Sequence, residues 1–307
     1  MATESVANRR NLLAGAIAGV AGFAAGAAGA SAIVGSKKGP RVVVDGRARF
    51  KDKVVLITGA TSGIGAVAAK MFAAEGGKVA FCGRRTDRGA EVESEIKALG
   101  GEAKYVRADV RVEDDVRRFV ETTVEFYGGL DICFNNAGIT IERPLHEYTA
   151  AEWDDVVNTD LRGNFLALKY QIPHLIKRGG GVVVVTASSN AIATNPKRSA
   201  YSAAKRGLVG MVQAAAQDYA DHNIRINTLI PGTTDTEFVR RAAGMMNAPD
   251  AVWEAAASVW AKSNVAVANR MARPEEIAAA ALMMASEEFT FMNGAQIVVD
   301  GGKTAHA

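Results

Sequence analysis

The 307-residue sequence is poor in cysteine, with only Cys82 and Cys133. Each cysteine falls in a short apolar run that is typical of a β-strand. We therefore expect both side chains to be buried as small apolar groups, and they give no indication of the cellular compartment. We also predict no metal site.

A marked excess of one charge is also missing. The chain has 36 Lys and Arg residues against 33 Asp and Glu, a formal net charge of +3. This charge is slight and dispersed, and there is no internal repeat or basic-aromatic patch, which argues against a nucleic-acid partner. A content of 49% hydrophobic residues with 31 glycines fits a soluble α/β domain with one large core.

Residues 1–36 differ from the rest. Arg9 and Arg10 precede an uncharged Ala/Gly-rich run over residues 12–36, a pattern that resembles a twin-arginine export signal, and small residues at 28–32 offer cleavage sites. Three interpretations stay open. A cleaved signal, which would make the protein periplasmic or exported, is our prediction; the alternatives are an uncleaved membrane anchor over residues 12–34 and a flexible tail.

Two details of this segment favour retention. Five glycines, at 15, 19, 22, 26 and 29, would form one stripe on a helix, as in closely packed membrane helices. Basic residues then follow within 37–49, and positive charge tends to stay in the cytoplasm. The alternative location is therefore the cytoplasm, with the protein either free or anchored to the membrane. We interpret residues 37–49 as a linker and 50–307 as the catalytic domain.

From Phe50 onward, short β-branched runs alternate with longer helical stretches. This alternation predicts a single-domain α/β fold, a doubly wound parallel sheet of the Rossmann type. The expected strands are Val54–Thr58, Val79–Cys82, Ala103–Arg107, Ile132–Phe134, Val182–Thr186, Ile224–Leu229 and Gln296–Val299, and helices are expected at 64–75, 87–99, 112–127, 151–177, 202–221 and 275–285. Residues 233–271 have no strand pattern and are expected to form a lid or two extra helices.

The sequence TGATSGIG at residues 58–65 joins the first expected strand to the first helix. Glycines allow a tight turn and a close approach to a pyrophosphate, and the helix N-terminus supplies N–H groups for it. The spacing G-x-x-x-G-x-G differs from the commoner G-x-G-x-x-G. We predict a nucleotide site with contacts at Gly59, Thr61, Ser62, Gly63, Ile64 and Gly65.

Tyr201 and Lys205 are four residues apart, and Ser188 lies thirteen residues before Tyr201. On a helix the phenol and the ammonium share one face. The fixed positive charge favours the phenolate, and a hydroxyl from another segment could hold the oxygen that gains or loses the proton. These three residues are the predicted proton-transfer group.

In this set of motifs the chain resembles the short-chain dehydrogenase/reductase family, in particular its 3-oxoacyl-carrier-protein reductase-like and carbonyl reductase-like members. The resemblance covers about residues 50–302, and its further motifs are Asp109-Val110, Asn135-Asn-Ala-Gly138, Pro231-Gly232 with Thr236, and Val299-Asp-Gly-Gly302. It implies strand order 3-2-1-4-5-6-7 and a homotetramer or homodimer. In that order a third strand separates the two cysteines by about 9–10 Å, too far for a disulfide.

The resemblance also implies residue roles. Tyr201 would exchange the proton, Lys205 would bind the nicotinamide ribose, and Ser188, rather than the adjacent Ser189, would hold the substrate oxygen. Asp109 would contact the adenine, Asn136 and Gly138 the ribose side, and Thr236 the nicotinamide carboxamide. The cofactor residues implied are Asp109, Val110, Asn136, Ala137, Gly138, Tyr201, Lys205, Pro231, Gly232, Thr234 and Thr236.

Nucleotide choice can be argued from charge. Sites for NAD usually place a carboxylate at the end of the second strand, where it binds the ribose 2′-hydroxyl. Here the chain has Arg84 and Arg85, which could hold a 2′-phosphate. We expect a preference for NADP(H), with NAD(H) possible, and Arg84 as the better candidate of the two.

One position departs from the family pattern. Asp160 stands where many members have an asparagine, whose main-chain carbonyl helps hold a water in the proton path. The aspartate keeps that carbonyl and adds a negative charge near Lys205, so we expect a persisting relay with an altered pH dependence. The alternative is that Asp160 only caps or bends its helix.

The leading hypothesis is an NADP(H)-dependent enzyme that interconverts a secondary alcohol and a ketone or aldehyde. The other is a nucleotide-binding regulatory or scaffold protein without turnover. A small-molecule substrate is expected, with a membrane partner only if residues 12–34 are retained. The substrate pocket is expected to include Ile139, Thr140, Asn190, Ala191, Asn195 and parts of 233–265.

Overall fold

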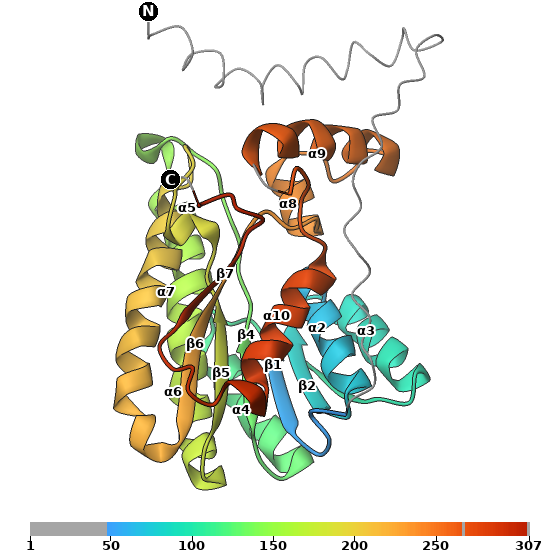
Figure 1. Cartoon of the computed structure of the whole chain (residues 1–307), viewed down its shortest axis with the longest axis vertical. Coiled ribbons are helices and arrows are strands. Elements are labelled where there is room, and N and C mark those ends of the chain that lie inside the picture. The colour runs from blue at the N-terminus through green and yellow to red at the C-terminus, as the bar shows by residue number, and fades with distance from the viewer. Residues whose placement is uncertain (1–47, 266–267, 306–307) are drawn as a thin grey trace, which may run out of the picture.

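The computed structural model describes residues 48–265 and 268–305. In this part of the chain one seven-stranded parallel sheet has the order β3-β2-β1-β4-β5-β6-β7, which confirms the predicted fold and topology (Figure 1). Each strand lies within two residues of its expected position. The strands are β1 Val54–Thr58, β2 Lys78–Gly83, β3 Glu102–Arg107, β4 Ile132–Asn135, β5 Gly181–Thr186, β6 Ile224–Pro231 and β7 Gln296–Val299.

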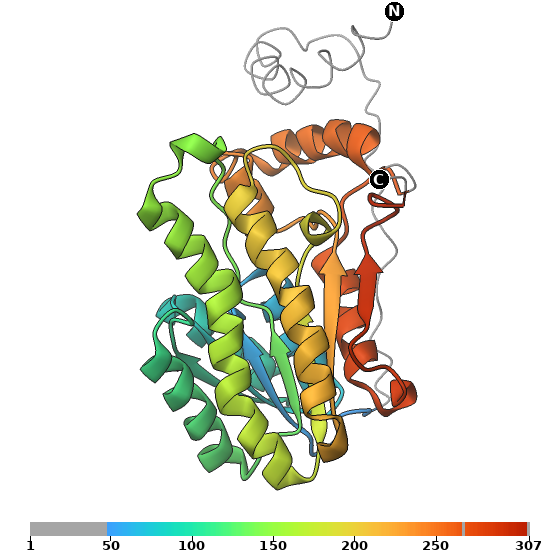
Figure 2. The ribbon, with the colours of Figure 1, turned by 90° about the vertical axis from the view of Figure 1, so that its left-hand side faces the viewer.

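Three helices cover each face of the sheet, because its central strands are apolar on both sides (Figure 2). On one face are α2 Gly63–Ala74, α3 Thr86–Ala98 and α10 Pro274–Ala285, and on the other are α4 Glu113–Tyr127, α6 Gly163–Arg178 and α7 Ser199–Asp218. Alternate residues of β1 separate accordingly: Val55 and Ile57 belong to the first core, Val54 and Leu56 to the second.

The segment between β6 and β7 crosses the carboxyl-terminal end of the sheet, where α8 Glu237–Ala242 and α9 Asp250–Asn264 lie (Figure 1). The structure shows the two extra helices, and the lid stays a prediction. Trp253 of α9 is buried, and its indole N–H donates to Asp235 at 2.7 Å, so this tryptophan fixes the segment rather than lining a pocket. Met246 stays exposed.

A single helix was expected over residues 151–177, but the chain forms α5 Ala150–Val157, a π-helical turn at Asn158–Arg162 and then α6. The residues at both ends of the turn keep helical dihedrals, and the apolar spacing of the sequence did not predict the turn. Turns of this type contain one extra residue per turn and frequently occur at functional sites. Asp160 is the central residue of this turn.

The folded part begins before the predicted boundary. The Arg49 guanidinium makes a bidentate ion pair with the buried carboxylate of Glu75, at 2.5 and 2.6 Å, and Phe50 packs on Phe72 with ring centroids 4.8 Å apart. The predicted export signal or anchor lies outside the described residues and stays a prediction. Among the described residues, none of the helices combines the length and hydropathy needed to cross a membrane.

Both cysteines are buried and free, on strands that β1 separates. Burial raises the pKa of the Cys82 thiol to about 12 and that of Cys133 well above its ordinary value. Both side chains are therefore neutral near pH 7 and act as small apolar groups, as expected.

A buried amide pair joins the sheet to α6. Asn135, the last residue of β4, donates to Gln171 at 2.9 Å, and Gln171 donates back at 2.8 Å. Both residues are fully buried. Each amide satisfies the other, so the pair fixes α6 against the strand that leads into the loop at Asn136–Gly138.

We predict that Gln171→Leu lowers the free energy of unfolding by about 2 kcal/mol, because it leaves the buried Asn135 amide without its partner. Urea unfolding followed by circular dichroism measures the change. The exposed Gln213 on α7 provides the control, since Gln213→Leu removes no buried partner. A loss no larger than that of the control would show that the pair does not stabilise the fold.

Candidate active site

Two loops meet so closely at the carboxyl ends of β1 and β4 that only glycine fits between them. Gly59 has φ of +69°, and a Cβ placed there would lie 2.6 Å from Ala137 Cα. A Cβ on Gly65 would lie 2.5 Å from the carbonyl oxygen of Gly59. The first turn of α2 therefore lies directly against the loop that precedes it.

The Thr58 hydroxyl holds these loops together. Thr58 is buried at the end of β1, and its Oγ1 accepts the N–H groups of Asn136 at 3.0 Å and Ala137 at 3.1 Å. The Asn136 amide reaches back and donates to the Gly59 carbonyl at 3.3 Å. One hydroxyl and one amide thus fix the relative position of the two loops.

The N-terminus of α2 is prepared for an anion. Its N-cap residue Ser62 makes no side-chain capping bond, and the first turn contains no acidic residue. The first N–H groups of a helix lack intrahelical partners and carry a partial positive charge. This arrangement fits a dinucleotide pyrophosphate.

Arg85 lies against the glycine loop. Its guanidinium donates to the Thr61 hydroxyl from Nε at 3.3 Å and from a terminal nitrogen at 3.1 Å, and to Ser62 at 2.5 Å. Its other terminal nitrogen lies 2.9 Å from the Glu237 carboxylate of α8. Arg84 is exposed and contributes to lowering the pKa of Asp109.

Asp109 follows β3, and its carboxylate pairs with Arg111 through two nitrogens. Burial opposes ionisation of Asp109, but the hydrogen bonds from Arg111 outweigh it, so the pKa of this carboxyl lies below its ordinary value. Arg111 also bonds Asp155 of α5. Val110, between them, is buried and would be 3.0 Å from a Cβ placed on Gly163.

The loop after β6 lies over the glycine loop. Gly232 donates its N–H to Val299 of β7 at 2.9 Å, and the Thr234 hydroxyl donates to the Gly232 carbonyl at 3.2 Å. The Thr236 methyl carbon would be 3.4 Å from a Cβ on Gly63. The predicted nicotinamide-side residues therefore adjoin the predicted phosphate-side residues.

Tyr201 and Lys205 share one face of α7, as the spacing predicted. The Lys205 ammonium lies 5.6 Å from the centroid of the Tyr201 ring. It donates to the carbonyl of Thr186, the last residue of β5, at 2.9 Å. Both side chains are nearly fully buried, which places the ammonium in a region of low dielectric where its charge acts strongly.

Asp160 provides a carboxylate to the same ammonium. Its Oδ2 lies 3.3 Å from Lys205 Nζ, and its Oδ1 accepts the Ile139 N–H at 2.7 Å. Burial raises the pKa of Asp160, and the attraction of Lys205 opposes this only in part. The Asp160 carbonyl accepts the Asn164 side-chain amide at 2.7 Å, so one side of the carbonyl predicted to hold water is already occupied.

Ser188 is positioned by its neighbour Asn190. The Ser188 hydroxyl oxygen accepts the backbone N–H of Asn190 at 3.2 Å and its side-chain amide at 3.4 Å. The side-chain Oδ1 of Asn190 in turn accepts the backbone N–H and the side-chain amide of Asn195, each at 3.2 Å. These bonds use Ser188 as an acceptor, so its own proton is free to be donated.

An apolar group surrounds Tyr201. It includes Ile139 after β4 and Phe238 of α8, whose ring centroid lies 6.1 Å from that of Tyr201. The Thr140 hydroxyl is buried and has no hydrogen-bond partner among the described residues. Of the residues expected in the pocket, Ile139 packs against the group that contains Tyr201, whereas Asn190 and Ala191 are buried.

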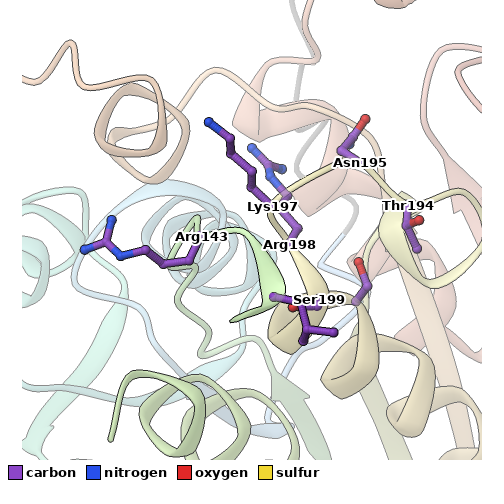
Figure 3. A pocket seen from close by; sticks show the side chains of 8 residues that line it. Arg143, Thr194, Asn195, Lys197, Arg198 and Ser199 are labelled. Carbon is purple, nitrogen blue, oxygen red and sulfur yellow. The ribbon is translucent and has the colours of Figure 1, made fainter. Parts of the chain in front are cut away.

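A polar pocket of about 230 Å³ adjoins the start of α7 (Figure 3). Lys197 and Arg198 extend in a common direction in this view, whereas Arg143 points away from them. Arg198 pairs with Glu142, and Arg143 pairs with Glu152. The residues that line the pocket are Arg143, Leu145, Thr194, Asn195, Lys197, Arg198, Ser199 and Ser202.

The structure brings the predicted residues to one end of the sheet, on the loops after β1, β2, β3, β4, β5 and β6 and the first turns of α2 and α7. Three contributing residues were not singled out from the sequence: Thr58, Arg111 and Glu237. Asn190 was expected in the substrate pocket, whereas the structure shows it bonded to Ser188. Thr58 begins the TGATSGIG motif and could have been noted as a hydroxyl at a strand end. Nothing in the local sequence links Glu237 to Arg85, 152 residues away.

Comparison with known proteins assigns the family. A profile described as short chain dehydrogenase matches residues 53–247, more than half of the chain. The chain therefore belongs to the short-chain dehydrogenase/reductase family, and it is an oxidoreductase of the kind that acts on CH–OH groups. Family members bind NAD(H) or NADP(H).

Two curated relatives and one solved structure illustrate the match. An A-factor type γ-butyrolactone 1′-reductase of Streptomyces virginiae is 38% identical and is matched over 85% of this chain and 99% of its own. Cyclohexanol dehydrogenase of an Acinetobacter species is 35% identical over 84% and 97% of the two chains. The crystal structure of levodione reductase superposes with a TM-score of 0.78 at 34% identity, covering 84% of this chain and all of that one.

We predict that Thr58→Val lowers the free energy of unfolding by about 2 kcal/mol, because two backbone N–H groups lose their acceptor. Urea unfolding measures this loss. Thr228 provides a matched control: it is buried in β6, and its hydroxyl has no hydrogen-bond partner among the described residues. Thr228→Val should be close to neutral, and equal losses in the two variants would contradict the role of Thr58.

Proposed function

We propose that this protein is an NADP(H)-dependent oxidoreductase that interconverts a secondary alcohol and a ketone or aldehyde. The observation that carries the proposal is the buried pair of Tyr201 and Lys205, because Lys205 bonds Thr186, two residues before Ser188. The phenol and the ammonium share a helix face, and the hydroxyl comes from a separate segment after β5. The small-molecule substrates of the related dehydrogenases support this class of reaction.

A nicotinamide dinucleotide, when bound, would supply or accept the hydride. The N-terminus of α2 would hold its pyrophosphate, the pair Asp109–Arg111 would border its adenine, and the loop Pro231–Thr236 would hold its carboxamide. Lys205 would bind the ribose next to the nicotinamide. The N-terminus of α2 fits this group because its first turn contains no acidic residue, and the close packing at Gly59 and Gly65 fixes its position.

The residues around the substrate oxygen have separate roles. Tyr201 donates a proton to the carbonyl oxygen in reduction and accepts one from the alcohol in oxidation. The buried Lys205 ammonium places a positive charge 5.6 Å from the centre of the Tyr201 ring. Ser188, held by Asn190, donates a hydrogen bond to the same oxygen, which stabilises the negative charge that develops there.

The neighbourhood of the site suggests the kind of substrate. The apolar group around Tyr201 would contact the hydrocarbon part of an alcohol, and the names of two relatives indicate compounds that contain rings. The basic residues at the adjacent pocket would tolerate or favour a carboxylate on that ring. A panel of cyclic alcohols and ketones with and without a carboxylate, assayed by nicotinamide absorbance, tests this proposal.

Tyr201→Phe keeps the ring and its contact with Phe238 but removes the hydroxyl. We expect kcat to fall at least about a hundredfold, because general acid–base catalysis is lost. The Kd of NADPH should remain within about twofold. Tyr219→Phe, at the other end of α7, serves as the control. Near-normal turnover by Tyr201→Phe would refute Tyr201 as the proton donor. If the wild type is inactive on the whole panel, the alternative of a nucleotide-binding regulatory or scaffold protein is favoured.

Asp160→Asn tests the carboxylate beside Lys205. The change removes a negative charge 3.3 Å from the Lys205 ammonium, so the pH–rate profile of alcohol oxidation should shift. Because burial raises the pKa of Asp160, its negative charge is lost as pH falls through that raised value, and the two enzymes should converge in acid. The exposed Asp154→Asn is the control, and coincident profiles would limit Asp160 to a structural role.

Nucleotide choice is tested at the two arginines. We give Arg85 priority over Arg84, because the glycine loop fixes its guanidinium. Arg85→Ala should raise the KM for NADPH about tenfold and that for NADH much less, because only NADPH carries the 2′-phosphate that the guanidinium would bind. Arg117→Ala, an exposed residue on α4, is the control. The NADPH preference would be refuted if the wild type had the lower KM for NADH and neither Arg84→Ala nor Arg85→Ala changed the two KM values.

A further inference from the structure

Glu237 connects the cofactor loops with the segment that covers Tyr201. It is the first residue of α8, and one carboxylate oxygen lies 2.9 Å from Arg85 while the other lies 3.3 Å from Arg88 of α3. We call these three residues the Arg–Glu clasp. The next residue, Phe238, contacts the Tyr201 ring. The clasp therefore links three places along the chain: the corner after β2, the start of α3 and the start of α8.

The Glu237 carboxylate is ionised in this position. The hydrogen bond from Arg85, with the charges of Arg88 and Arg241, holds the pKa of Glu237 below its ordinary range. A cavity of about 440 Å³ lies beside it, lined by Arg88, Asp235, Thr236, Glu237, Arg240 and Met246. Space is thus available for this carboxylate to move away from Arg85.

All three nitrogens of the Arg85 guanidinium make hydrogen bonds. Nε and one terminal nitrogen donate to Thr61 and Ser62, and the other terminal nitrogen donates to Glu237. A phosphate that binds Arg85 through two nitrogens must therefore replace one of these partners. The carboxylate is the partner that a phosphate displaces, because two anions on one guanidinium repel each other whereas the hydroxyls can donate to phosphate.

We propose that Glu237 is a specificity-determining residue that competes with the 2′-phosphate of the nucleotide for Arg85. This inference rests on the proposed binding of that phosphate at the arginines after β2. Two consequences follow. The wild-type enzyme discriminates less between NADPH and NADH than its arginines alone would allow. Binding of a 2′-phosphate releases the start of α8, whereas a nucleotide without this phosphate leaves the clasp closed.

The test compares 2′,5′-ADP, which carries the phosphate, with 5′-AMP, which lacks it, by calorimetric titration of the full-length protein. Glu237→Gln should tighten 2′,5′-ADP binding about fivefold, the scale of one exposed ion pair, and change 5′-AMP binding less than twofold. The matched control is Glu91→Gln, which removes a carboxylate 3.6 Å from Arg88 but none from α8. That control should leave both affinities unchanged.

Hydrogen exchange of the α8 amides provides a second measurement. In the wild type, exchange over Glu237–Ala242 should be faster with 2′,5′-ADP than with 5′-AMP. In Glu237→Gln the two nucleotides should give equal exchange. Equal exchange in the wild type would overturn the proposed release of α8.

The remaining outcomes separate this inference from the proposed function. If the wild type prefers 2′,5′-ADP and Arg85→Ala removes the preference, but Glu237→Gln binds it equally or more weakly, the competition is overturned and the NADPH preference stands. Weaker binding would show that Glu237 orients Arg85 instead. If neither the wild type nor Arg85→Ala distinguishes the two nucleotides, both proposals fail together.

Discussion

The close approach of two loops, at Gly59 and Ala137, is the constraint on which the site depends. The Thr58 hydroxyl stabilises this contact by accepting two backbone N–H groups from the loop after β4. Because these loops leave adjacent strands, their contact fixes both the N-terminus of α2, a natural anion site, and the path of the chain from Asn136 to Ile139. Ile139 then donates to Asp160, and Asp160 meets Lys205, so one contact at the cofactor side determines positions at the proton-transfer side.

Much of this arrangement could be predicted from the sequence, because it rests on local patterns. Apolar runs between helices predict a parallel sheet, and Tyr201 and Lys205 lie on one helix face because helical geometry requires it. The departures concern contacts between distant segments. No local sequence pattern near Glu237 predicts its contact with Arg85. The local sequence around Asp160 likewise predicts a regular helix rather than a π-helical turn. The sequence also favoured Arg84, whereas the glycine loop anchors Arg85, since side-chain direction after a strand is set by tertiary contacts.

The ion pair of Asp160 and Lys205 unites structural and chemical roles in one place. A buried ammonium needs a compensating partner, and here it has a carboxylate and the Thr186 carbonyl. The same carboxylate fixes the loop that contributes Ile139 to the wall around Tyr201. One side chain at this position therefore contributes both a charge beside Lys205 and a hydrogen bond to the backbone of Ile139.

The π-helical turn at Asn158–Arg162 also sets the rotational phase of everything after it. In an α-helix one residue corresponds to about 100° of rotation about the axis. A chain one residue shorter at this turn could continue as a regular helix, but α6 would then present a different face to the sheet. Gln171 would turn away from Asn135, and the buried amides would lose each other. The wide turn thus acts as a spacer that matches the orientation of Asp160 on one side to the packing of α6 on the other.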